Sequence, residues 1–208
     1  MYFEEFLSKI DHIKTQKLGG LGAQFKLAPK LRMKYDQQKI EASNPKKAAV
    51  LSLFYPNDEN KTCFLLTLRA SYKGKHSSQI SFPGGKIEEA DTSLKETALR
   101  EASEEVGVLK NQIHIIRETT DVFIPPSNFL ATPFLAYTSS RPNFKKNYEV
   151  ADLIEVLVED LIDESSITST IMHTTYMDKV EVPCFKLNNY IVWGATAMML
   201  SEIKELLK

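Results

Sequence analysis

The sequence has few of the features that mark membrane, secreted or nucleic-acid-binding proteins. No apolar run approaches the length that spans a membrane, and the first six residues are acidic, unlike a signal peptide. The net charge of −1 excludes a general electrostatic hold on nucleic acid or membrane. The two cysteines, Cys63 and Cys184, lie in separate apolar stretches, where buried free thiols are expected. We therefore expect a cytoplasmic protein that binds neither nucleic acid nor membrane.

The 208 residues are enough for a sizeable core, and we expect a single domain over residues 1–208. Apolar side chains recur at helical spacing from Phe3 to Ile13, which predicts a short helix that ends before Gly19. This helix and the irregular, basic residues 19–32 would form an N-terminal extension over about residues 1–35. The basic stretch is either a solvated loop or a flap near an anionic substrate.

Apolar stretches separated by turn residues predict a β-sheet. Residues 48–55 and 62–68 are joined by a turn and predict a hairpin, and Asn188-Asn189 predict another hairpin turn. Residues 129–137 read as a strand that Pro133 would place near an edge or bulge, because proline cannot donate to a β-ladder. A closing helix is expected from Gly194. The pattern alone predicts a mixed α/β domain.

The most informative stretch runs from Gly84 to Val108. A glycine pair leads into an acidic loop, and a helix is predicted from about Thr92 to Val106. Ser93 stands at capping-box spacing before this helix, and Gly107 is suited to end it.

Three glutamates share one face near the end of this helix, because Glu101, Glu104 and Glu105 are three and four residues apart. Carboxylates this close repel one another, and a hard divalent cation is a physical reason to tolerate the crowding. Mg²⁺ takes oxygen ligands and usually reaches a substrate phosphate through its remaining positions. The alternative is an acidic helix that only faces water, which leaves the ordered glycines unexplained.

The same stretch resembles the Nudix box. The pattern is matched by Gly85 and by Arg100-Glu101-Ala102-Ser103-Glu104-Glu105-Val106-Gly107-Val108. Asp91 stands where the box has a loop glutamate, and one extra residue separates it from Arg100. The resemblance implies an α/β/α sandwich with a mixed β-sheet. It also implies a metal-dependent hydrolase of nucleoside diphosphate derivatives.

The resemblance further implies roles for individual residues. Glu101 and Glu105 would be the principal ligands of Mg²⁺ or Mn²⁺, with Glu104 as a further ligand or as the base that takes a proton from water. Arg100 would orient these carboxylates. The carbonyl of Gly85 would complete the metal shell, and Asp91 would act through water in the outer shell.

The residues before the box resemble the coenzyme A pyrophosphatase branch of this family. The similarity is carried by Leu65-Leu66-Thr67-Leu68-Arg69 and by His76-Ser77-Ser78-Gln79-Ile80-Ser81-Phe82-Pro83-Gly84-Gly85, although Ser78 replaces an expected glycine. The branch implies coenzyme A or a derivative as substrate, with 3′,5′-ADP and 4′-phosphopantetheine as products. We expect substrate contacts at Arg69, His76, Gln79, Gly84 and Phe129. Homodimers are common in the family, so a homodimer is possible here.

Two other functions are compatible with the residues. The first keeps the reaction and changes the substrate to ADP-ribose, a dinucleoside polyphosphate or a damaged nucleotide. The second is a non-enzymatic nucleotide-binding module on the same fold. The intact Arg100, Glu101, Glu104 and Glu105 argue against the second, because a pure binder gains little from crowded carboxylates.

Overall fold

The computed structural model describes residues 1–70, 79–174 and 177–208. Its helices are α1 (Phe3–Thr15), α2 (Gly20–Gln24), α3 (Gln37–Ala42), α4 (Leu94–Val106), α5 (Val158–Ile162) and α6 (Gly194–Leu207), with short 3-10 turns η1 (Phe25–Leu27), η2 (Arg32–Lys34), η3 (Lys110–Gln112) and η4 (Glu164–Ser166). Its strands are β1 (Lys46–Pro56), β2 (Thr62–Arg69), β3 (Ile80–Ser81), β4 (Gly84–Lys86), β5 (His114–Glu118), β6 (Val122–Ile124), β7 (Phe129–Tyr137), β8 (Val150–Leu157), β9 (Ile167–Thr174), β10 (Met177–Leu187) and β11 (Tyr190–Trp193).

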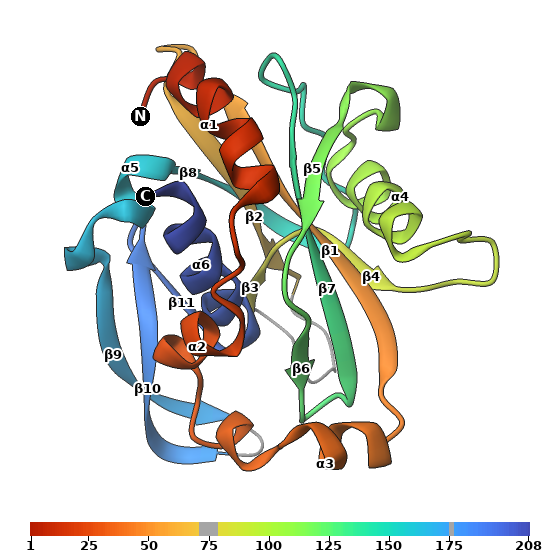
Figure 1. Ribbon diagram of the computed structural model, residues 1–208, viewed down its shortest axis with the longest axis vertical. Helices are drawn as coiled ribbons and strands as arrows, with labels where there is room; N and C mark the ends of the chain where they lie inside the picture. Colours follow the sequence, from red (N-terminus) through yellow and green to blue (C-terminus); the bar gives the residue numbers. More distant parts are fainter. Residues whose placement is uncertain (71–78, 175–176) are drawn as a thin grey trace.

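Within these ranges, an eight-stranded mixed sheet is built on β1 and β7, which run parallel (Figure 1). The other pairings in this sheet are antiparallel: β2 and β4 pair with β1, β5 and β6 pair with β7, and β3 and β8 pair with β2. A second, three-stranded sheet has the order β11-β10-β9. The prediction of a mixed α/β fold is confirmed.

The large sheet is covered on both faces, which explains the continuous apolar sequence of β1. Leu51 and Leu53 face a core shared with Ala98 and Ala102 of α4, whereas Phe54 faces a core shared with α1 and α6. Successive side chains of a strand point to opposite faces, so a strand buried on both sides is apolar throughout. Figure 1 shows α4 on one side of the sheet and α1 and α6 on the other, which makes the three layers of an α/β/α sandwich.

Several local predictions are confirmed. The N-terminal helix ends at Thr15, before Gly19, and the closing helix begins at Gly194. Asn188 and Asn189 have φ values of 48° and 64° between β10 and β11, as a tight hairpin turn requires. Both cysteines are free and buried. No helix among the described residues is long and apolar enough to cross a membrane.

One prediction is wrong and another is only partly right. Residues 19–32 are not irregular, because α2 and η1 form there and pack against α6, and η2 begins at Arg32. Strand β7 is not at an edge, because it lies between β1 and the β5 and β6 partners. The alternative of a nearby bulge is confirmed by a shift of register in β5, between Ile115 and Arg117. Pro133 is tolerated because the partner of β7 changes at this point, from β6, which reaches Ala131, to β5, which starts opposite Phe134.

Candidate active site

Helix α4 is fixed at both ends by the residues that the sequence singles out. The Ser93 hydroxyl accepts a hydrogen bond from the amide of Glu96 at 3.3 Å, as an N-cap does. Gly107 ends the helix in the left-handed conformation, with φ of 74°. The last two turns of α4 therefore hold their side chains in a defined direction.

Strand β4 brings the glycine pair beside those turns. Gly84 and Gly85 pair with Val50 and Ala49 of β1, so the pair is part of a short strand. A Cβ on Gly84 would overlap the carbonyl oxygen of Ala49, and one on Gly85 would overlap the carboxylate of Glu101. The missing side chains therefore allow both the close strand pairing and the position of Glu101.

The three glutamates of α4 differ in exposure. The side chain of Glu105 is 3% exposed, that of Glu101 15% and that of Glu104 56%. Glu105 accepts hydrogen bonds from the Gly84 amide at 3.1 Å and from Nη1 of Arg69 at 3.3 Å. Burial raises the pKa of Glu105 to about 7 against the opposing effects of Arg69 and Gly84, and burial also raises the pKa of Glu101. Glu105 is therefore a carboxylate deep in the site, and Glu104 reaches solvent.

Arg100 donates hydrogen bonds to three acidic side chains of the box. Its Nε and Nη2 donate to the two oxygens of Asp91, each at 3.0 Å, and its Nη1 donates to Glu101 at 3.0 Å and to Glu104 at 3.2 Å. Asp91 also accepts from the Thr97 hydroxyl and the Glu88 amide. The hydrogen bond to Arg100 holds the pKa of Asp91 well below its usual range. The oxygens of Asp91 are thus engaged in orienting Arg100, in spite of the shifted spacing.

A further carboxylate, Glu149, reaches this site from outside the box, and no sequence pattern predicts it. It accepts from Nη2 of Arg69 at 3.4 Å, and its charge adds to the raised pKa of Glu105. The segment before β8 is held on α4 by a hydrogen bond from the Asn147 amide to the Glu105 carbonyl. Because β8 pairs with β2 so that Val150 faces Arg69, only the sheet register could have placed Glu149 here.

The predicted metal ligands do not meet at one point. In the described ranges, no group of three or more His, Cys, Asp and Glu side chains is arranged to hold a metal ion. The carboxylates turn instead to Arg69 and Arg100, which offsets their mutual repulsion. The donors nevertheless fit a hard divalent cation, because they are all oxygens and because the absent side chain of Gly85 lets the Glu101 carboxylate lie against β4. The assignment of Glu101, Glu104, Glu105 and Gly85 as ligands stays a prediction.

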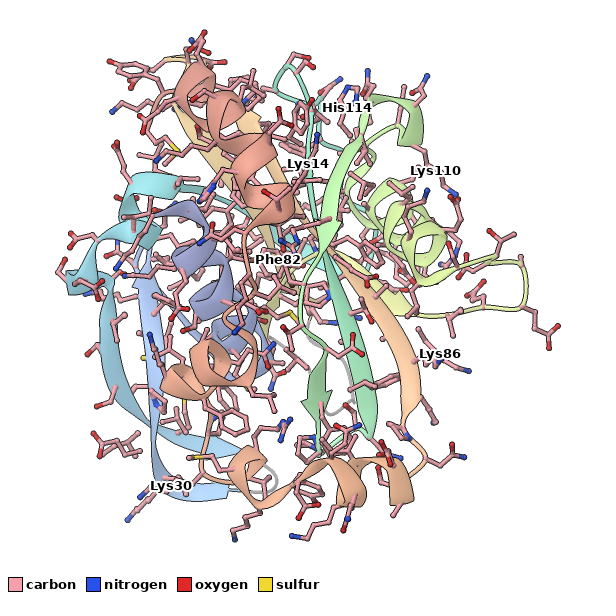
Figure 2. All side chains as sticks on the ribbon, in the orientation of Figure 1. Lys14, Lys30, Phe82, Lys86, Lys110 and His114 are labelled. Carbon is pink, nitrogen blue, oxygen red and sulfur yellow. The ribbon has the colours of Figure 1, made fainter. Side chains whose placement is uncertain are left out.

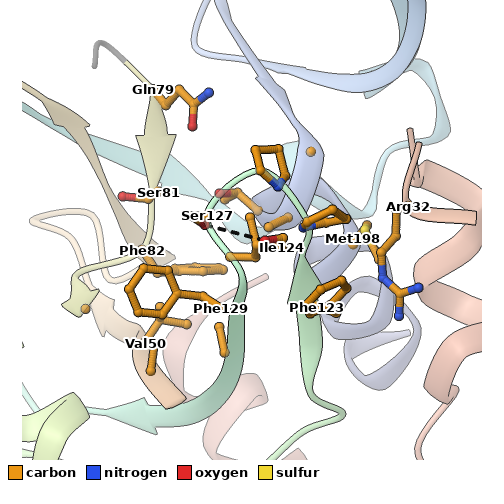
Figure 3. Close-up of a pocket in the computed structure, with 18 of the residues that line it drawn as sticks. Arg32, Val50, Gln79, Ser81, Phe82, Phe123, Ile124, Ser127, Phe129 and Met198 are labelled. Atoms are coloured by element: carbon orange, nitrogen blue, oxygen red, sulfur yellow. Dashed lines mark hydrogen bonds between the residues drawn. The ribbon is translucent and has the colours of Figure 1, made fainter. Parts of the chain in front are cut away.

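A cavity of about 360 Å³ opens beside this group. Four of the five predicted substrate residues line it: Arg69, Gln79, Gly84 and Phe129. The fifth, His76, lies outside the described residues. Figure 3 shows Val50, Phe82 and Phe129 on one side of the cavity and Phe123, Met198 and Arg32 on the other. Figure 2 places Phe82 near the middle of the molecule, so the cavity reaches well inside.

The walls of the cavity come from distant parts of the chain. Pro29, Leu31 and Arg32 belong to the N-terminal extension, Phe123 to β6, and Met198 to α6. Part of the basic segment therefore lies at the cavity, and its role as a flap near an anionic substrate stays a prediction. Residues 123–127 and Phe129 also line the cavity.

Comparison with known proteins agrees with this arrangement. Residues 45–170 match the NUDIX domain. Proteins described as uncharacterized Nudix hydrolase NudL from Yersinia pestis (strain Pestoides F) and Yersinia pseudotuberculosis (serotype O:1b) are each 31% identical to this chain over 143 residues, which are 68% of this chain and 70% of those proteins.

A solved structure shares the fold at lower sequence identity. The MutT/nudix family protein from Enterococcus faecalis superposes with a TM-score of 0.54 at 14% identity, covering 86% of this chain and 75% of that one. The matched residues 45–170 contain both the glycine pair of β4 and the acidic turns of α4. This chain belongs to the NUDIX domain family.

Proposed function

We propose that this chain hydrolyses the diphosphate bond of a nucleoside diphosphate derivative, and that its substrate is coenzyme A or a coenzyme A derivative. The observation that carries the proposal is one continuous cavity with two kinds of lining. Arg69, Gly84 and Gly85 line it next to the carboxylates, whereas the rest is mostly apolar and aromatic. A diphosphate suits the first part, and a base or a pantetheine arm suits the second.

Two of the residues that resemble the coenzyme A branch support this substrate. Arg69 closes strand β2 and Gln79 precedes β3, and both line the cavity. Their backbones are joined by a hydrogen bond from the Arg69 amide to the Gln79 carbonyl at 3.0 Å. The products from coenzyme A would be 3′,5′-ADP and 4′-phosphopantetheine.

Glu101, Glu105 and the Gly85 carbonyl would hold Mg²⁺ or Mn²⁺, with Glu104 as a further ligand. Such an ion supplies charge neutralisation at the phosphoryl oxygens and a lowered pKa of bound water. The chain itself fixes the geometry: the Gly84 amide and Arg69 anchor Glu105, and Arg100 anchors Glu101.

Hydrolysis adds the hydroxyl of a water to one phosphorus and leaves the bridging oxygen on the other product. The proton of that water needs an acceptor within hydrogen-bond reach. The exposure of Glu104 supports it for this role, and Glu101 is the second option. Arg69 faces the same end of the cavity and can bind a phosphate oxygen once Glu149 releases it.

The whole chain takes part in this function. Arg32 near the N-terminus and Met198 near the C-terminus line the same cavity as the box residues. We therefore infer that residues 1–208 act as one domain, with residues 1–35 as an extension that completes the substrate pocket.

The test is product analysis with purified protein. Coenzyme A, ADP-ribose and a dinucleoside polyphosphate would each be incubated with Mg²⁺ or Mn²⁺, with Glu105→Gln and a chelator as controls. The expected result is 3′,5′-ADP from coenzyme A, lost in both controls. Cleavage of only another diphosphate would exclude coenzyme A and keep the reaction. No cleavage of any diphosphate with either metal would favour a binding module.

A further inference from the structure

Arg32 is a buried cation in the wall of the substrate cavity. It lies in η2 and is 4% exposed, and its guanidinium carbon lies 5.3 Å from the ring centre of Phe25 and 5.8 Å from that of Phe123. Figure 3 shows Arg32 beside Phe123, across the cavity from Val50 and Phe82. The two aromatic rings fix the plane of the guanidinium.

The charge of Arg32 is less well compensated than that of the other site arginines. Its Nη1 donates to the Tyr35 carbonyl at 2.9 Å, and its Nε is buried and has no hydrogen-bond partner in the described part of the chain. Arg69 and Arg100 each contact carboxylates, but no ion pair joins Arg32 to a described acid. Burial accordingly lowers the pKa of Arg32. A buried charge without a counter-ion is costly unless a ligand supplies one.

A purely structural role explains only part of this arrangement. Arg32 does join the N-terminal extension to β6 through Phe25 and Phe123, which a long apolar side chain could also do. The extension is held in place by other contacts as well: buried Glu202 of α6 accepts hydrogen bonds from the Gly20 amide and from the amide and hydroxyl of Thr120. An arginine is therefore not needed to attach this segment.

We propose that Arg32 is a specificity-determining residue that binds a phosphomonoester of the substrate, separate from the diphosphate that is cleaved. The proposal rests on the proposed function, which places a nucleotide in this cavity. The cleaved diphosphate has its own cation, Arg69, beside Gly84 and Gly85. Arg32, on the opposite wall, would select substrates with an additional anionic group, and the planar fork of arginine suits the oxygens of a phosphate.

The first experiment measures binding without catalysis. Dissociation constants of 3′,5′-ADP and AMP, which differ by one phosphomonoester, would be measured by calorimetry on the metal-free protein. Because a hydrogen bond to a charged group contributes about 1.5–3 kcal/mol, the wild type should prefer 3′,5′-ADP by about tenfold or more. Arg32→Met should remove this preference by lowering the affinity for 3′,5′-ADP more than that for AMP, and Arg32→Lys should keep part of it.

A remote charge provides the matched control. Lys110 is exposed at the outer side of α4 in Figure 2, so Lys110→Gln removes one positive charge without touching the cavity. This variant should keep the full preference for 3′,5′-ADP. Thermal unfolding of each variant would identify those that lose the fold, and Arg32→Lys serves as the second variant if Arg32→Met unfolds.

The second experiment separates this proposal from the proposed function. Values of kcat/KM would be compared for coenzyme A and 3′-dephospho-coenzyme A in the wild type and in Arg32→Met. A selective loss with coenzyme A supports the proposal. If coenzyme A is not cleaved but Arg32→Met still removes the preference for 3′,5′-ADP, the proposed substrate fails and the role of Arg32 stands. Two results would overturn the role of Arg32. In the first, Arg32→Met weakens binding of 3′,5′-ADP and AMP equally and lowers kcat/KM equally for coenzyme A and 3′-dephospho-coenzyme A. In the second, the wild type itself binds 3′,5′-ADP no more tightly than AMP.

Discussion

The two walls of the cavity are built in different ways. The catalytic wall is a single stretch from Gly84 to Val106. It lines the cavity through β4, and α4 carries its acidic groups, which Arg100 and Arg69 bind. The recognition wall is mostly apolar, and its lining residues come from three distant segments: residues 29–32, 123–127 and 193–198. Under the proposed function, the catalytic residues therefore come mostly from one continuous stretch of the sequence, whereas the residues that select the substrate come from segments that only the fold brings together.

The largest expected effect is on the catalytic wall, from Gly85→Ala. The new methyl group would overlap the Glu101 carboxylate, which must then move away from β4. Displacing one charged group from a preorganised site costs on the order of 100- to 1,000-fold in activity. We expect kcat/KM for the cleaved diphosphate to fall by that amount, with KM changing less than kcat.

Gly22→Ala is the matched control for this substitution. Gly22 lies in α2, and a Cβ there would meet no atom within 4 Å. Alanine is favoured over glycine in a helix, so this variant should be as stable as the wild type or slightly more stable. If Gly85→Ala kept full activity, the position of Glu101 beside Gly85 would not matter for the reaction.

The next effect concerns the anchor of the recognition wall, Glu202. Its buried carboxylate accepts hydrogen bonds from the Gly20 amide at 2.7 Å and from the Thr120 hydroxyl at 2.6 Å. Glu202→Ala leaves these donors without their acceptor, and an unsatisfied buried donor costs about 1–3 kcal/mol. We expect urea unfolding to show a loss of about 2–3 kcal/mol.

The KM and kcat of Glu202→Ala test whether the recognition wall and the catalytic wall act separately. Loosening α2 and the loop before β6 should raise KM more than it lowers kcat, because both segments support the recognition wall. Glu202→Gln, which keeps one acceptor oxygen, should lie between Glu202→Ala and the wild type. A fall in kcat with KM unchanged would contradict the separation of the two walls.

A smaller effect is expected from Asp91→Asn on the catalytic wall. An asparagine can keep one of the two hydrogen bonds from Arg100 but not the paired charge. Groups that orient a metal or catalytic ligand through another side chain usually cost 10- to 100-fold when replaced, and we expect about tenfold in kcat/KM here. A steady-state assay would check this, and unchanged activity would mean that Glu101, Glu104 and the Lys86 carbonyl are enough to orient Arg100.

The difference between the walls also decides what the sequence could predict. Helix α4, its Ser93 cap and its Gly107 end follow from spacing alone, because these contacts lie within four residues along the chain. For Asp91, which is shifted in the box, the resemblance implied only a role through water in the outer shell of the metal. The bidentate pairing itself required the structure.

The structural features that the sequence analysis did not predict all depend on contacts between residues far apart in the chain. Residues 19–32 carry no helical periodicity, because α2 is only five residues long. The amide of Gly20 at its N-terminus donates to Glu202, about 180 positions away in the sequence. Arg32 looked like one cation among several in a basic stretch. Glu149 reaches Arg69 only through the register of β8 on β2. No local motif encodes any of these positions.

The smallest expected effect is a pH dependence of stability at the Asp91–Arg100 pair. The folded-state pKa of Asp91 lies below its ordinary value, because Arg100 and two other donors bind its charged form. A depressed carboxyl pKa contributes stability above the unfolded-state pKa, about 3.9, and this contribution is lost as the pH falls through the folded-state pKa. Asparagine resembles the protonated aspartate, so the stabilities of the wild type and Asp91→Asn should differ most at neutral pH and converge below about pH 4.

Urea unfolding at several pH values would measure this gap in the free energy of unfolding between wild type and variant. The exposed Asp58→Asn is a control that should show a much smaller gap. A gap that stayed constant down to acidic pH would mean that Asp91 orients Arg100 by its shape and hydrogen bonds, and that its charge adds nothing to the catalytic wall.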